Sequence, residues 1–161
     1  MIMDEERDSI EVMESLGTMS KEDSVEIKKF NLVPAGKYTG LLSTYKVGDP
    51  VKTEAGTSPF EGKRITRLDF ILNGETRDYH LFVAAYPQLI KATSKAGGKY
   101  IPQECQVADQ LFAALEMYGQ DFTDVLNRAQ ETSLRFAVGI SEPKDPQYRA
   151  KNTVKIYAVK G

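Results

Sequence analysis

Four stretches of the chain alternate apolar and polar residues with a period of two, which is typical of half-buried strands. The first covers residues 38–47 and is followed by residues 48–62, whose glycines, prolines and polar side chains predict a long, flexible loop. The second covers residues 63–72 and ends at Asn73-Gly74, a dipeptide typical of two-residue hairpin turns. We therefore expect a long strand, a loop and then a hairpin whose return strand covers residues 75–84.

After this hairpin the period changes to spacings of three and four, which are typical of amphipathic helices. A short helix is expected from Pro87 to the break at Gly97-Gly98, because proline suits the first helical position. A longer helix is expected over residues 102–118, where apolar residues form a stripe. Asp121 then predicts the N-cap of a third helix that ends at Ala129.

The remaining alternating stretches, residues 134–140 and residues 153–159, predict a C-terminal hairpin around a turn at residues 143–146. The complete order is five strands with the helices between the third and the fourth. This is the order of an OB-fold, a small and partly open Greek-key barrel. The sequence therefore predicts an α+β, mainly β domain that forms a five-stranded, OB-fold-like barrel with a helical insertion between strands 3 and 4.

Charge is unevenly distributed along the 161 residues, although the net charge at neutral pH is only −2. Residues 1–29 hold nine acids against four bases, whereas residues 134–161 hold six bases against two acids. Such asymmetry between segments suggests an acidic tail on a domain with a basic face. We expect a mobile N-terminal tail over residues 1–29 and a nucleic-acid-binding domain over residues 30–161.

The residue types that build metal centres and disulfides are scarce. Cys105 is the only cysteine and His80 the only histidine, so the sequence excludes an internal disulfide and a multi-cysteine zinc site. No apolar run approaches the roughly 20 residues of a membrane helix, and the N-terminus is acidic where a secretory signal would be basic. We expect a cytoplasmic protein that uses no metal, no cofactor and no membrane.

The sequence also lacks the motifs of common catalytic sites. It contains no Walker-type phosphate loop and no His-Glu-x-x-His pattern. Asp78 and His80 would share one face of a strand and could form a general-base pair, but no nucleophile accompanies them. The favoured interpretation is therefore a histidine that stacks on a ligand. Asp121 and Asp124 are better explained as helix caps than as metal ligands. We therefore expect no enzymatic activity.

Lysine and arginine are interleaved with aromatic residues on the predicted strands, in three groups along the chain. Single-stranded nucleic acids need this combination, because bases stack on aromatic rings and phosphates bind cations along a groove. The moderate excess of positive charge predicts salt-sensitive binding without strong base specificity. The candidate nucleic-acid-binding residues are Lys37, Tyr45, Lys46, Lys63, Arg64, Arg67, Tyr79, His80, Tyr148, Arg149, Lys151, Lys155 and Tyr157.

Not every aromatic ring is available for stacking, because several fall in or near apolar alternation. The rings expected in the core are Tyr38, Phe70, Phe82 and Phe136. The rings expected at the surface, because charged residues flank them, are Tyr45, Tyr148 and Tyr157.

Four segments resemble a family of small phage and prophage proteins. They are Leu-Val-Pro-Ala-Gly-Lys-Tyr at residues 32–38, Gly-Lys-Arg at residues 62–64, the predicted helix over residues 107–119, and Tyr-Arg-Ala-Lys-Asn-Thr-Val-Lys-Ile-Tyr at residues 148–157. The resemblance spans residues 30–161, and the last segment is its most specific part. Members of this family are regarded as OB-fold-like replication or recombination proteins that bind single-stranded DNA. The resemblance thus implies that function in the cytoplasm of a bacterial host cell.

Three hypotheses follow. The first is a non-catalytic protein that coats single-stranded DNA during phage replication or recombination, with self-association into a homo-oligomer left open. The second is a protein-interaction adaptor of a replication or anti-host system, in which the acidic tail binds replication or recombination proteins. The tail of this chain is N-terminal, whereas many single-stranded-DNA-binding proteins carry theirs at the C-terminus. The third hypothesis is a carboxylate-metal nuclease. It is the weakest of the three, because no cluster of possible metal ligands in the sequence rises above chance spacing.

Overall fold

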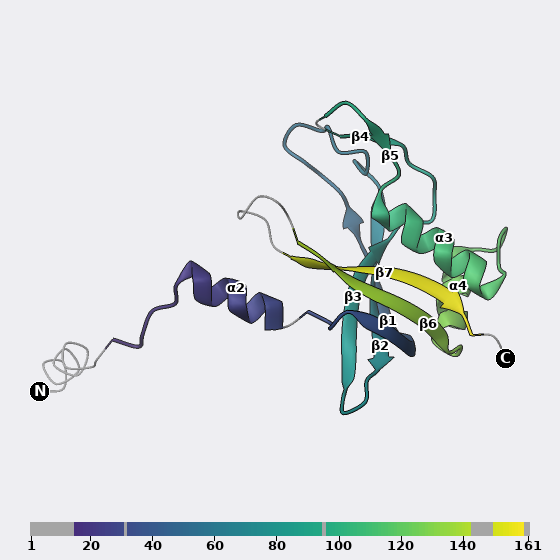
Figure 1. Cartoon of the computed structure of the whole chain (residues 1–161). Coiled ribbons are helices and arrows are strands. Elements are labelled where there is room, and N and C mark those ends of the chain that lie inside the picture. Colours follow the sequence, from purple (N-terminus) through teal and green to yellow (C-terminus); the bar gives the residue numbers. More distant parts are fainter. Residues whose placement is uncertain (1–14, 31, 95, 143–149, 160–161) are drawn as a thin grey trace, which may run out of the picture. The chain divides into compact units, whose positions relative to one another are not determined.

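The computed structural model describes residues 15–30, 32–94, 96–142 and 150–159 (Figure 1). The chain divides into two units, residues 1–31 and residues 32–161. In the first unit, helix α2 (Lys21–Phe30) begins with a reciprocal pair of caps. The Ser20 Oγ accepts a hydrogen bond from the Asp23 N–H at 3.0 Å, and the Asp23 carboxylate accepts one from the Ser20 N–H at 3.2 Å. The segment predicted as a tail therefore contains a helix.

Five antiparallel strands form the main sheet of the second unit. In spatial order they are β3 (Asp78–Ala85), β2 (Arg64–Asn73), β1 (Gly36–Pro50), β6 (Leu134–Ser141) and β7 (Lys151–Ala158). Four of them correspond to the alternating stretches and β3 to the return strand of the predicted hairpin, and the α+β class is confirmed. The return strand begins at Asp78 and not at residue 75, because Asn73 pairs with Asp78 and residues 74–77 form the hairpin loop in place of a two-residue turn. The turn predicted between the last two strands lies outside the described residues.

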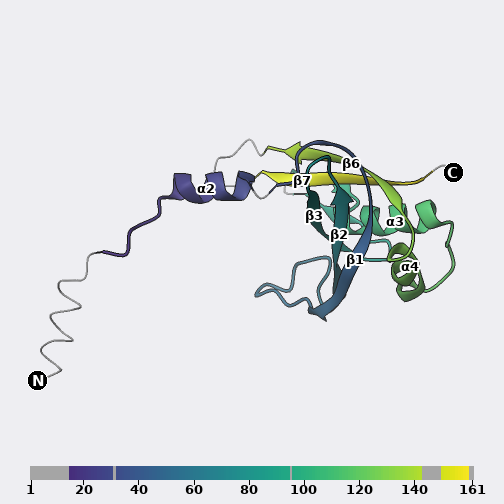
Figure 2. The ribbon, with the colours of Figure 1, turned by 90° about the horizontal axis from the view of Figure 1, so that it is seen from below.

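The sheet is strongly coiled, and β1 is the strand that coils it. β1 pairs with β2 along its length and with β6 over its first five residues, with register shifts after Leu42 and after Val47. Gly40 lies so close to β2 that a Cβ there would overlap the carbonyl oxygen of Ile71. As a result, β6 and β7 cross β2 and β3 at a steep angle (Figure 1, Figure 2).

Helices α3 (Gln103–Leu115) and α4 (Phe122–Ala129) follow β3 in the sequence and precede β6, as predicted. Helix α3 contacts both edge strands, β3 and β7. The side-chain oxygen of Gln110 accepts a hydrogen bond from the Ile156 N–H of β7 at 2.8 Å, so the helix covers an edge that strand pairing would cover in a closed barrel. Within the described residues β3 and β7 do not pair, and the sheet is open.

The main core lies between the inner face of this sheet and the two helices. Its largest fully buried side chains include Phe70 of β2, Phe136 of β6, Leu111 of α3 and Leu126 of α4. The rings of Phe70 and Phe136 meet edge to face with centroids 5.0 Å apart, which confirms the predicted burial of both.

The prediction of a helix that begins at Pro87 is wrong. Residues 87–101 instead form a small two-stranded sheet of β4 (Ala92–Thr93) and β5 (Lys99–Tyr100). Gly97 adopts a φ of +87°, and the Ser94 N–H donates to the Gly98 carbonyl at 2.8 Å, which closes the turn between the strands. A proline at the first helical position favours a helix only weakly, and the turn outweighs that preference here.

The flexible loop predicted over residues 48–62 begins later than expected, because β1 runs to Pro50. Residues 51–63 are held by hydrogen bonds and by a second, smaller core. The Val51 N–H donates to the Lys63 carbonyl at 2.9 Å, and the Glu61 carboxylate accepts from the Thr53 N–H at 3.0 Å. The members of the smaller core are Phe60, Tyr86, Ile90 and Cys105, which are all buried. This segment is therefore fixed against the start of α3.

Candidate nucleic-acid interface

The main sheet has one face in the core and one face in solvent, because successive side chains of a strand point to opposite sides. On β7, Val154 and Ile156 are buried while Lys155 and Tyr157 are exposed. On β6, Leu134 and Phe136 are buried while Arg135 between them is exposed. On the first part of β1, Lys37 and Thr39 are exposed. We use the name β7 patch for the outward side chains of Lys37, Arg135, Lys151, Lys155 and Tyr157.

The strand register brings four members of the β7 patch into two neighbouring rows, while Lys151 lies further along β7, opposite Ser141. In the first row, Lys37 of β1 lies opposite Ala137 of β6, which lies opposite Lys155 of β7. In the second row, Thr39 lies opposite Arg135, which lies opposite Tyr157. Three cations and an exposed ring thus occupy adjacent positions, and none of the outward residues in these two rows is acidic.

A hollow of about 490 Å³ lies on this surface, lined by members of both rows and by Asn73 of β2. The guanidinium carbon of Arg135 lies 6.0 Å from the centroid of the Tyr157 ring, which is 44% exposed. The Asn73 side-chain amide donates a hydrogen bond to the Thr39 hydroxyl at 3.3 Å. The hollow therefore offers a ring for stacking, an amide and hydroxyl for hydrogen bonds, and cations for a phosphate.

A second group of candidates lies on the outward side of β1, β2 and β3, and we call it the β3 patch: Lys46, Arg67, His80 and Phe82. Phe82 is 74% exposed, so its predicted burial is wrong. Its ring stacks on His80 with centroids 6.1 Å apart and planes 16° apart. The His80 Nδ1 lies 3.0 Å from the carboxylate of Asp69, so the partner of this histidine is Asp69 and not Asp78.

Two of the predicted tyrosines do not lie on the outward face. Tyr45 is half-buried against the core, and its hydroxyl donates to the Asn127 side chain of α4 at 3.0 Å. Tyr79 also packs against the core and meets Tyr38 edge to face with centroids 5.7 Å apart. Burial raises the pKa of the Tyr38 phenol, and the neighbouring Tyr79 raises it further. These rings therefore support the sheet from its inner side.

The other predicted residues lie at the start of β2 or outside the described part. Lys63 is half-buried, and the exposed Arg64 donates from its Nη1 to the Gly48 carbonyl at 3.2 Å. Tyr148 and Arg149 lie outside the described residues. The structure thus brings Lys37, Lys155 and Tyr157 together. It places Lys151 further along β7, opposite Ser141, and Lys46, Arg67 and His80 nearer the other edge of the sheet.

Two outward residues were missed among the candidates, Arg135 and Phe82. Each shares a face of its strand with another outward side chain, because Arg135 lies two residues from Ala137 and Phe82 lies two residues from His80. The alternation contained this signal, but it does not state which phase of a strand faces water.

The described residues give no sign of a metal centre, since no group of three or more His, Cys, Asp or Glu among them is placed to hold an ion. Asp121 caps α4, as predicted, by accepting a hydrogen bond from the Thr123 N–H at 3.0 Å. Within the described ranges, no helix has the length and apolarity that crossing a membrane requires.

Comparison with protein-family models, with curated proteins and with solved structures found no match to this chain.

Proposed function

We propose that this chain is a non-catalytic single-stranded-DNA-binding protein and that the DNA lies across the β7 patch. The observation that carries the proposal is the pair of rows in which Lys37, Arg135 and Lys155 surround the exposed ring of Tyr157. Phosphates would pair with the three cations, and a base would stack on the tyrosine. The β3 patch, with Phe82 stacked on His80, would extend the path of the DNA across the sheet.

We also propose that the sheet is an OB-fold-like barrel whose last closure is made by a helix. The strand order β3-β2-β1-β6-β7 with helices between the third and fourth strands supports this assignment. Helix α3 contacts the two strands that would pair in a closed barrel. The cytoplasmic role in phage replication or recombination is supported by the resemblance of the terminal motifs, which include Lys151, Lys155 and Tyr157.

The chemistry of the β7 patch favours single strands over duplexes. An unpaired base exposes a π face that stacks on a protein ring for roughly 1–3 kcal/mol, whereas a duplex hides its bases in its own stack. The patch offers few groups for reading base edges, so affinity should depend strongly on salt and weakly on sequence.

Fluorescence anisotropy of a labelled oligo-dT of about 30 nucleotides tests this proposal, because that length spans several of the ~4–16-nucleotide sites of one OB fold. The full chain should bind the oligonucleotide, and unlabelled duplex of equal length should compete poorly. The variant Lys37→Gln/Arg135→Gln/Lys155→Gln should bind at least about tenfold more weakly, because three phosphate contacts are lost.

The matched control is Lys52→Gln/Lys91→Gln/Lys99→Gln, which removes the same charge from exposed positions outside both patches. This control should keep most of the affinity. Equal weakening by both variants would show that binding follows net charge and not the β7 patch. No binding by the unmodified chain at low salt would overturn the proposed function.

A further inference from the structure

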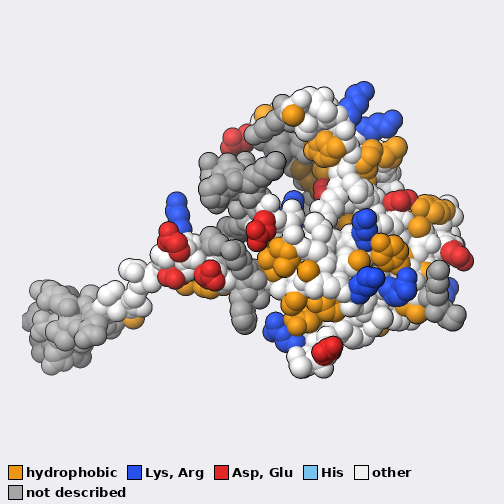
Figure 3. Space-filling model, viewed as in Figure 1, with side chains coloured by type: hydrophobic (Ala, Val, Ile, Leu, Met, Phe, Trp, Pro, Cys, Tyr) orange, Lys and Arg blue, Asp and Glu red, His pale blue; other side chains and the backbone are white. Residues whose placement is uncertain are grey.

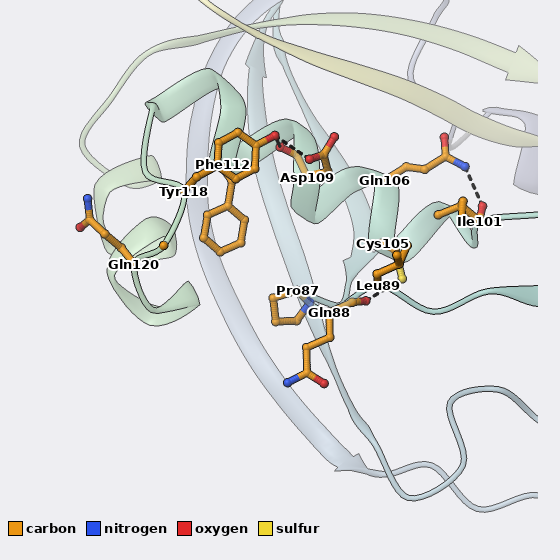
Figure 4. Close-up of a pocket in the computed structure, with 11 residues that line it drawn as sticks. Pro87, Gln88, Leu89, Ile101, Cys105, Gln106, Asp109, Phe112, Tyr118 and Gln120 are labelled. Atoms are coloured by element: carbon orange, nitrogen blue, oxygen red, sulfur yellow. Dashed lines mark hydrogen bonds between the residues drawn. The ribbon is translucent and has the colours of Figure 1, made fainter.

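A groove of about 880 Å³ runs along α3, between the helix and the segment that follows β3 (Figure 4). We call it the α3 groove. Its principal walls are Pro87, Leu89, Cys105, Asp109, Phe112 and Tyr118. Cys105, Asp109 and Phe112 lie at positions i, i+4 and i+7 of α3, so they share one helix face.

The groove is lined by rings and exposed apolar side chains. The Phe112 ring stacks on Tyr118 with centroids 5.9 Å apart, and on Phe122 with centroids 5.7 Å apart. Leu89 is 69% exposed and Tyr118 is 62% exposed at its rim. Large apolar side chains left in water beside a hollow are typical of an interaction surface.

Hydrogen bonds hold each wall of the groove in place. The Tyr118 hydroxyl donates to the Asp109 carboxylate at 2.6 Å, which fixes the ring against α3 (Figure 4). The Cys105 thiol donates to the Gln88 carbonyl at 3.1 Å, and the Tyr86 N–H donates to the Glu104 carbonyl at 3.0 Å. The groove is therefore preformed, which lowers the entropic cost of binding.

The charge around the groove decides what can occupy it. Among the residues that line the groove, Asp109 is the charged one, and no lysine or arginine lines it. In Figure 3, isolated acidic side chains lie over the helical end of the molecule, while cations gather over β6 and β7 and also at the β4–β5 end. Acidic surroundings repel the phosphates of a nucleic acid and attract a cationic ligand.

We propose that the α3 groove binds a segment of a partner polypeptide in which a large apolar side chain lies next to lysine or arginine. The apolar side chain would pack between Leu89 and Phe112, and the cation would pair with the Asp109 carboxylate, whose second oxygen is not used by Tyr118. The N-terminal segment of this chain does not fit, because its nine acids against four bases would meet the acids of α3. The inference does not depend on the proposed DNA-binding function.

Panning a phage-displayed library of short random peptides against the full chain tests the proposal. The enriched sequences should share a large apolar residue next to Lys or Arg. A labelled peptide made from that consensus should bind the full chain, and Leu89→Ser and Asp109→Lys should each weaken it by at least about tenfold, as truncation of a central contact does. Both residues are exposed, so neither change should impair folding.

The matched control is Val47→Ser/Glu75→Lys, which makes similar chemical changes at exposed positions that do not line the groove and should leave peptide binding unchanged. Oligo-dT binding by Leu89→Ser should equal that of the unmodified chain. An acidic consensus, no consensus, or peptide binding that both groove variants leave intact would overturn the proposal. Self-association that Leu89→Ser abolishes would also overturn it, because the occupant would then be a second copy of the chain.

Discussion

Two exposed tyrosines, one on the β7 patch and one in the α3 groove, show how one small domain can offer two surfaces for different partners. Tyr157 lies beside the guanidinium of Arg135 on the β7 patch, whereas the hydroxyl of Tyr118 is bonded to the carboxylate of Asp109 on the α3 groove. The first ring lies among cations and the second among acids. The ring is the same in both places, so the charge around it determines which partner it can meet.

The two surfaces also differ in what supports them. The β7 patch lies on sheet strands whose register fixes each side chain, whereas the α3 groove lies between a helix and an irregular segment held by single hydrogen bonds. Both share one core, because α3 packs on the sheet through Leu111. The surfaces should thus be chemically separable by surface mutations but should be lost together when the core is disturbed.

The largest effect is expected from Gly40→Ala, which disturbs that shared core. The added Cβ would overlap the Ile71 carbonyl oxygen of the neighbouring strand, and a backbone atom cannot rotate away. We expect the free energy of unfolding to fall by about 3 kcal/mol, the upper part of the range for overpacking. Urea unfolding measures this loss, and Thr44→Ala, an exposed change on the same strand, should stay within about 0.5 kcal/mol of the unmodified chain. A mild effect of Gly40→Ala would show that β1 and β2 are less closely paired there.

The next effect concerns salt. For single strands each phosphate contact adds about 0.7 to the slope of log affinity against log salt, so Lys37→Gln/Arg135→Gln/Lys155→Gln should reduce the slope by about 2. When salt is raised from 50 to 200 mM, the unmodified chain should therefore lose about 20-fold more affinity than this variant loses. Anisotropy titrations at several salt concentrations measure the slope.

The contrasting variant for the salt experiment neutralises the acids of the other surface, Glu104→Gln/Asp109→Asn/Glu116→Gln. These residues make no phosphate contact in the proposed complex, so the slope should stay as it is in the unmodified chain. A slope that changes equally in both variants would contradict the separation of the two surfaces.

The sequence alone predicted the elements of this fold where local rules are strong. Asn73-Gly74 marked the position of the hairpin, although its loop is longer than the two-residue turn that this dipeptide favours, and Asp121 marked the start of α4 through its own hydrogen bond to the backbone. It failed at residues 87–101, where burial of Ile90 and Ala92 in packed surroundings and the turn at Gly97 replaced the expected helix. The burial of Ile90 beside Phe60 and Cys105 depends on residues distant in sequence and was not readable from a local pattern, whereas the turn at Gly97 is local.

The candidate site was predicted in composition but not in geometry. Alternation showed that Phe82 belongs to a strand, but the choice of face depends on pairing across β2, which sequence periodicity does not supply. The row that joins Lys37 to Lys155 crosses three strands that are far apart in the chain. The α3 groove was not predicted at all, because its walls come from segments that meet only after the helix docks on the sheet.

The comparison of the two tyrosines can be sharpened by removing each ring. Tyr157→Leu should weaken oligo-dT binding by about tenfold, since stacking of one base contributes roughly 1–3 kcal/mol. Tyr118→Leu removes a ring of similar exposure from the acidic surface and should leave oligo-dT binding unchanged. Tyr157→Phe keeps the ring and should retain the affinity. If Tyr157→Leu binds as well as the unmodified chain, the stacking role of Tyr157 is wrong.

The smallest effect is a change in a pKa at the groove. The hydrogen bond to Asp109 raises the pKa of Tyr118, and partial burial and the negative charge of the carboxylate add to it. Asp109→Asn removes the charge, so the pKa of Tyr118 should fall toward its ordinary value, and the ring should lose its proton at lower pH than in the unmodified chain. NMR of tyrosine labelled at Cζ measures this titration, with Glu104→Gln at the other end of α3 as the control. An unchanged titration of Tyr118 in Asp109→Asn would mean that the carboxylate does not hold this ring, and the groove would then lack one of its fixed walls.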